Sequence, residues 1–218
     1  ANPYNYPAWV RYLGIKAGGA GDKKKLEYLI QFSKAMPHEH NLIDYVAGHV
    51  LKINPEKVNP YELYACGVSP DSTPEAEELF IRQFWKKLIA DCPEVKLHAV
   101  YKEGTTGNFL NLWLEKSKNV KWNSKMKSKT SKAFQQALLA LTGKEKIFIK
   151  MMKSYRRFLI MWNDEKYMMQ AHEFVQDHLK NITSDQVKKE MAGMGRKMGI
   201  LLKNDKILNM YGQTRESE

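Results

Sequence analysis

The residues best suited to chemistry in this chain are cations, and they gather between Lys116 and Arg157. This basic segment holds 13 Lys and Arg residues against one acid, Glu145, so its net charge is +12. Residues 1–115 hold 13 basic and 14 acidic residues, and residues 158–218 hold 9 of each. The segment therefore supplies the whole +11 of the chain, and charge segregated in this way predicts a polyanionic partner. Nucleic acid is the first candidate, and an anionic membrane surface is the second.

A helix expected over residues 144–162 concentrates part of this charge on one side. Its apolar residues fall within about 120° of arc, which predicts a buried face. Four cations fall within about 60° of one another, at spacings i, i+4, i+7 and i+11; they are Lys146, Lys150, Lys153 and Arg157. This cationic stripe is about 16 Å long at the helical rise. Solvated faces usually mix charges of both signs, so the stripe favours bound phosphates over a merely solvated face.

Further cations lie close by, and they complete the candidate binding residues. They are Lys116, Lys118, Lys121, Lys125, Lys127, Lys129, Lys132 and Arg156. Lysine holds a phosphate as a point charge and carries no base specificity. An aromatic ring in such a groove can stack an unpaired base. Trp122 fits that role and the role of a core anchor equally well, whereas Tyr155 falls on the apolar arc and is expected in the core.

The sequence predicts no enzyme, no metal site and no cofactor. His38-Glu39-His40 lacks the spacing of a zinc helix, and residues 14–24 are glycine-rich without forming a phosphate-binding loop. Cys66 and Cys92 predict two reduced thiols in an intracellular protein. Glu75, Glu77 and Glu78 fall in the first turn of a helix that starts at Pro74, where they stabilise the helix dipole. No apolar run approaches the length of a membrane span, so no membrane-spanning segment is expected, and nucleic acid is preferred over a membrane as the partner.

The predicted fold is mainly α-helical, with two lobes joined by a basic loop. Residues 95–114 alternate apolar and polar side chains, which predicts either a small β-hairpin or a loop followed by a helix. Prolines and glycines near the start predict an irregular arm with at most one short helix. The expected organisation is an N-terminal arm (1–21), an N-terminal helical lobe (22–115), a basic loop (116–131), a C-terminal helical lobe (132–203) and a polar tail (204–218).

Together these features predict a non-enzymatic protein that binds nucleic acid without sequence preference, with single-stranded RNA or DNA favoured. A basic cleft flanked by an arm and a tail is typical of a viral nucleoprotein or coat-type protein. Such a protein would self-associate through residues 1–21 or its C-terminal region and would be cytoplasmic or virion-associated. Two alternatives remain open: a double-stranded DNA-binding accessory factor for replication or transcription, and a scaffold that docks an acidic protein partner.

Overall fold

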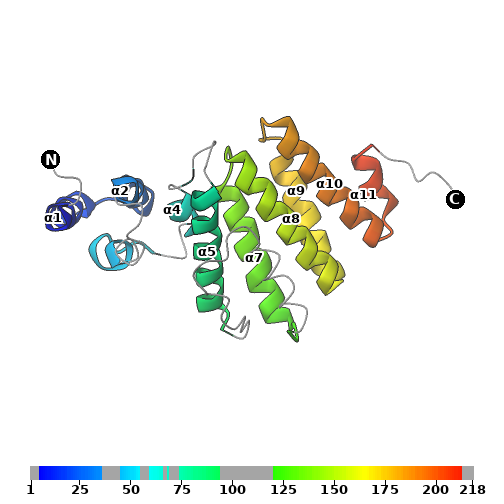
Figure 1. The fold of residues 1–218 in the computed structure, drawn as a ribbon, viewed down its shortest axis with the longest axis horizontal. Coiled ribbons are helices and arrows are strands. Elements are labelled where there is room, and N and C mark those ends of the chain that lie inside the picture. Colours follow the sequence, from blue (N-terminus) through cyan, green and yellow to red (C-terminus); the bar gives the residue numbers. More distant parts are fainter. Residues whose placement is uncertain are drawn as a thin grey trace. The chain divides into compact units, whose positions relative to one another are not determined.

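Helices make up the fold of this protein. The computed structural model describes residues 5–35, 45–54, 59–65, 68, 74–93 and 120–212, and these ranges contain helices, turns and no strand (Figure 1). The predicted mainly α-helical class is therefore confirmed. The ambiguous segment 95–114 lies outside the described residues. None of the described helices is long and apolar enough to cross a membrane.

The chain divides into two compact units, residues Ala1–Ser69 and Pro70–Glu218. The first unit contains α1 (Tyr6–Ala17), α2 (Asp22–Ala35), the π-helix η1 (Val46–Val50) and α4 (Tyr61–Ala65). Its core is formed by Leu13, Leu29, Phe32, Val46, Leu51 and Ile53. The Asn59 carboxamide accepts a hydrogen bond from the Tyr61 backbone N–H at 3.0 Å, at the start of α4.

The N-terminal arm was expected to be irregular with at most one short helix, but residues Tyr6–Ala17 form the 12-residue helix α1. The Asn5 side chain caps the helix by accepting a hydrogen bond from the Ala8 N–H at 3.2 Å. Pro7 lies in the first turn, where a missing N–H costs nothing because helix N-termini leave those groups unpaired. The glycines that suggested irregularity end the helix instead, with Gly19 at a φ of 74°.

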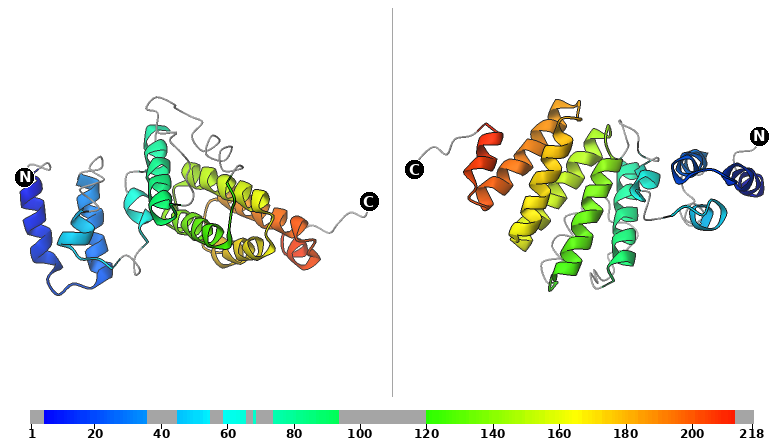
Figure 2. Two further views of the ribbon diagram at one scale, coloured as in Figure 1. Left: turned by 90° about the horizontal axis from the view of Figure 1, so that it is seen from below. Right: turned by 180° about the vertical axis from the view of Figure 1, so that it is seen from behind.

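The second unit is built around a ring of four helices. They are α7 (Ser124–Ala140), α8 (Glu145–Trp162), α9 (Glu165–Leu179) and α10 (Asp185–Leu201). α7 packs on α8, α8 on α10, α10 on α9 and α9 on α7. α5 (Pro74–Asp91) adds to this ring beside α7, and the short α11 (Asp205–Met210) packs on α10 (Figures 1 and 2).

Aromatic rings from three helices form the centre of the second unit. Phe134 of α7 stacks on Tyr155 of α8, with ring centroids 5.2 Å apart and planes 12° from parallel. Phe158 lies 5.5 Å from Phe134 and 6.0 Å from Trp85 of α5. All four side chains are fully buried. These rings fix α8 with its apolar arc inward, as the periodicity of residues 144–162 predicted.

The prediction of a basic loop was wrong for residues 124–131. These residues form the first turns of α7, in the second unit. The Asn123 side chain caps this helix by accepting a hydrogen bond from the Met126 N–H at 2.9 Å. Met126, Thr130 and Ser131 are buried. Lysine is a good helix former, so the many lysines here are compatible with a helix. The apolar pattern that signals a helix is weak because Thr130 and Ser131 occupy the buried face.

The expected polar tail was also wrong in part, because residues 205–210 form α11. The Asn204 side chain caps this helix, and Ile207 and Leu208 are buried. Tyr211 follows the helix, and its hydroxyl accepts a hydrogen bond from the Gln176 side chain at 2.7 Å and lies 3.0 Å from Nδ1 of His172. The glycines of α10 make this docking geometrically feasible. A Cβ on Gly195 would lie 2.2 Å from the Tyr211 hydroxyl oxygen, and one on Gly199 would lie 2.9 Å from Ile207.

Gly195→Ala should therefore destabilise the protein by about 1–3 kcal/mol, because the added methyl group overlaps the Tyr211 ring. Gly193→Ala is the matched control on the same helix, since a Cβ added at this position would meet nothing within 4 Å. That control should be neutral or gain up to about 1 kcal/mol from helix propensity. Denaturant unfolding of both variants checks the prediction, and equal stability of the two would contradict the described docking of Tyr211.

Stability should also fall as the pH drops below about 6.5, in part because of His172. Burial lowers the pKa of this histidine, against a smaller opposing effect of Glu173. Since the folded-state pKa lies below the unfolded one, the unfolded chain binds the proton first, and the contribution of His172 is complete above the unfolded pKa and lost toward the folded pKa. Unfolding at pH 7.5 and 5.5 should show a smaller acid-induced loss for His172→Gln than for the wild type. An identical loss would exclude this role.

Candidate functional site

The cationic stripe of α8 lies on the solvent face of the second unit. Lys146, Lys150, Lys153 and Arg157 are all exposed, whereas the residues between them are largely buried. The one-sided arrangement follows from the aromatic core, because burying Tyr155 and Phe158 turns the opposite side of α8 outward. The structure thus brings together these four predicted site residues on one helix face.

Acids from other helices reach Lys150 and Lys153 of this stripe. The Lys150 ammonium pairs with the Glu77 carboxylate of α5, whose side chain is only 4% exposed, while Lys150 itself is 51% exposed. Lys153 lies 3.4 Å from a Glu190 carboxylate oxygen of α10. No local pattern signals these pairs, because the partners are 73 and 37 residues apart in the chain. Glu77 was expected to act on its helix dipole, and the ion pair with Lys150 is a second role that sequence reasoning missed.

The lysines of α7 are spread over more than one face of the second unit. Lys127 donates a hydrogen bond to Asp164 at 2.8 Å, and this contact lowers the pKa of the Asp164 carboxyl group. The Lys129 ammonium donates to the backbone carbonyl of Asp91. Lys121, Lys125 and Lys132 are exposed. The Arg156 side chain is partly buried. Lys116 and Lys118 lie outside the described residues.

Two aromatic residues of the basic segment act in the core. Tyr155 is fully buried, as expected, and its hydroxyl lies 2.6 Å from that of Ser131; burial raises the pKa of this phenol. Trp122 is half-buried, with its ring centroid 5.5 Å from that of Phe158 and 5.3 Å from that of Trp162. Of the two roles left open for Trp122, the packing is that of a core anchor. Packed in this way, Trp122 and Tyr155 give no support for stacking of unpaired bases in the second unit.

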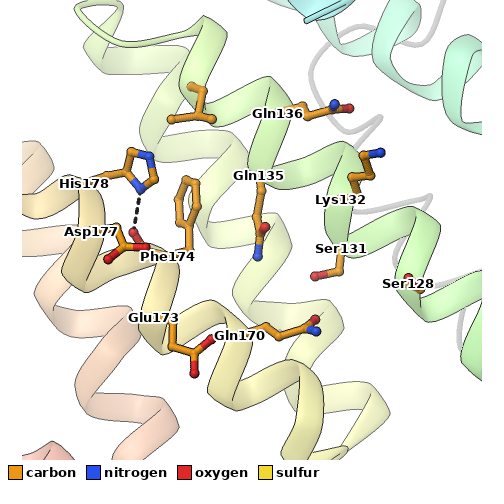
Figure 3. Close-up of a pocket in the computed structure, with 11 residues that line it drawn as sticks. Ser128, Ser131, Lys132, Gln135, Gln136, Gln170, Glu173, Phe174, Asp177 and His178 are labelled. Atoms are coloured by element: carbon orange, nitrogen blue, oxygen red, sulfur yellow. Dashed lines mark hydrogen bonds between the residues drawn. The ribbon is translucent and has the colours of Figure 1, made fainter. Parts of the chain in front are cut away.

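A groove of about 500 Å³, lined by both polar and apolar side chains, runs between α7 and α9 (Figure 3). Lys132, Ser131 and Gln135 line it from α7, and Glu173 and Asp177 line it from α9. At one end Nδ1 of His178 donates a hydrogen bond to the Phe174 carbonyl oxygen at 2.8 Å. Because its two carboxylates repel phosphate, this groove fits a polyanion less well than the stripe of α8.

The part of the chain that the structure describes contains no cluster of three or more His, Cys, Asp or Glu residues able to hold a metal ion. Cys92 is fully buried. Comparisons with protein-family models, curated proteins and solved structures give no match to this chain. The geometry of the second unit is therefore the basis for a functional proposal.

The Lys150–Glu77 pair should contribute to stability more than its surface position suggests. Lys150→Met removes the ammonium that pairs with a buried carboxylate, and we expect a loss of about 1–3 kcal/mol. Lys146→Met removes the same charge from the same helix face, but Lys146 itself forms no ion pair with another described residue. It should stay within about 0.5 kcal/mol of the wild type. Thermal unfolding of the two variants decides, and equal melting temperatures would contradict a structural role for Lys150.

Proposed function

We propose that this protein binds nucleic acid without sequence preference and without catalysis, using the cationic stripe of α8 to hold phosphates. The observation that carries the proposal is the exposure of Lys146, Lys150, Lys153 and Arg157 along one face of a helix whose other face is core. Lysine ammonium groups hold phosphates as point charges. This contact therefore depends on the charge and spacing of the phosphates and does not distinguish one base from another.

The ion pairs within the stripe are compatible with phosphate binding. Lys153 is 49% exposed and its contact with Glu190 is long, at 3.4 Å. Exposed pairs of this kind contribute about 0–1 kcal/mol, so exchanging the carboxylate for a phosphate costs little. Lys150 is different, because its partner is buried. In this proposal Lys146 and Lys153 take phosphates readily, Arg157 adds a further exposed cation, and Lys150 holds α5 against α8.

The same pairs favour a second candidate, the docking of an acidic protein. Glu77 and Glu190 show that carboxylates fit against the stripe, and an acidic partner would present more of them. A competition with polyglutamate of matched total charge separates the two candidates. Retention of a bound oligonucleotide favours the nucleic-acid proposal, and its displacement favours the acidic partner. Duplex and single strands both present phosphates, so the stripe alone does not discriminate between them.

The double variant Lys146→Gln/Arg157→Gln should weaken binding of a fluorescent oligonucleotide and flatten its dependence on salt. The slope of log K against log[salt] is negative, and the loss of two phosphate contacts should reduce its magnitude by about 1 to 2. The measurement is fluorescence anisotropy from low to moderate salt. Lys180→Gln/Lys206→Gln is the matched control, because it removes the same charge from exposed positions outside the basic segment.

The control variant should keep the wild-type slope. Equal losses in the two double variants would mean that net charge, and not the stripe, governs binding. A wild-type protein that binds no oligonucleotide at low salt would contradict the proposed function as a whole.

A further inference from the structure

The first unit displays an aromatic pair on its surface. The rings of Tyr45 and His49 stack with centroids 4.7 Å apart and planes 13° from parallel. Both side chains are exposed, and Tyr45 retains 47% of its accessible surface. Large aromatic rings dominate core energetics when they are buried, and most of the described aromatic side chains of this protein are less exposed than this pair. A stacked pair left in solvent therefore needs an explanation other than folding.

The backbone around this pair is fixed by packing on its other side. η1 closes with a hydrogen bond from the Leu51 N–H to the Val46 carbonyl at 2.9 Å, five residues back. Val46 and Leu51 are buried in the core of the first unit. The widened turn of a π-helix is rare and is frequently found at functional sites. The core thus holds Tyr45 and His49 as a preformed platform.

Cations accompany the exposed rings of the first unit. Lys52 is exposed three residues beyond His49, at a left-handed φ of 49°. On α1, Tyr12 is 44% exposed and the Lys16 ammonium lies 5.8 Å from its ring centroid. Sequence-independent binding of single strands combines aromatic rings that stack bases with cations that hold the backbone. The first unit offers that combination, whereas the second unit packs Trp122 and Tyr155 into its core.

We propose that Tyr45 and His49 form a stacking platform for an unpaired nucleobase, so that the favoured ligand is single-stranded nucleic acid. This inference rests on the proposed function, because it concerns the same class of ligand. It adds what the stripe of α8 lacks, a contact that duplex DNA does not satisfy because its bases are already stacked and paired. Stacking accepts every base, so the platform discriminates strand state and not sequence.

The test compares Tyr45→Ala and Tyr45→Phe in the full chain, with three labelled probes of equal length. The probes are oligothymidylate, an abasic strand with the same phosphates, and a blunt duplex. Loss of one stacked base should weaken binding of Tyr45→Ala to oligothymidylate about 5- to 100-fold. The abasic strand and the duplex should bind Tyr45→Ala as they bind the wild type. Tyr45→Phe keeps the ring and should bind all three probes normally.

Ile15→Ala is the matched control for loss of an exposed apolar side chain, since Ile15 is 71% exposed on the same unit. It should bind all three probes like the wild type. An unchanged affinity of Tyr45→Ala for oligothymidylate would overturn the platform while leaving the stripe intact. Equal weakening for all three probes would also overturn it, because a base contact cannot act on an abasic strand. A wild-type protein that binds none of the probes would overturn the proposed function as well.

Discussion

The packing of α8 against aromatic rings from α5 and α7 is the interaction on which the second unit depends. The ring of Phe134 contacts those of Tyr155 and Phe158, and Trp85 of α5 contacts both Phe134 and Phe158. Burying these rings is the main favourable contribution to the stability of this region. It also leaves α8 a single orientation, in which its cations face solvent. Core and candidate binding surface are therefore two consequences of one amphipathic helix.

The charges on that surface are partly balanced by the fold itself. Glu77 and Glu190 bring carboxylates to the stripe from helices that lie far away in the sequence. A polyanion at this face would meet a surface that is cationic overall but has local carboxylates, and its binding would depend on the more accessible side chains. Contact through phosphates alone would be insensitive to sequence and to strand state. Any preference for unpaired strands would then have to arise at exposed rings, which in the described residues belong to the first unit.

The sequence predicted features that depend on residues close together in the chain. It did not predict features that depend on contacts between distant residues. The periodicity of residues 144–162 correctly predicted the buried face of α8. The first turns of α7, residues 124–131, were missed because Thr130 and Ser131 take buried positions that apolar residues usually occupy. α11 was missed because a six-residue helix with two buried side chains carries little periodic signal. The partners of Lys150 and Lys153, like the groove between α7 and α9, depend on tertiary contacts that no spacing along the chain encodes.

Chemical footprinting of lysines tests the central claim most directly. The intact protein would be acetylated briefly with and without a saturating single-stranded oligonucleotide, and the modification of each lysine would be quantified by mass spectrometry. The account predicts strong protection of Lys146 and Lys153, with Lys180 and Lys206 modified equally in both samples. Uniform protection of all four lysines, or protection of Lys180 and Lys206 without the stripe, would contradict it.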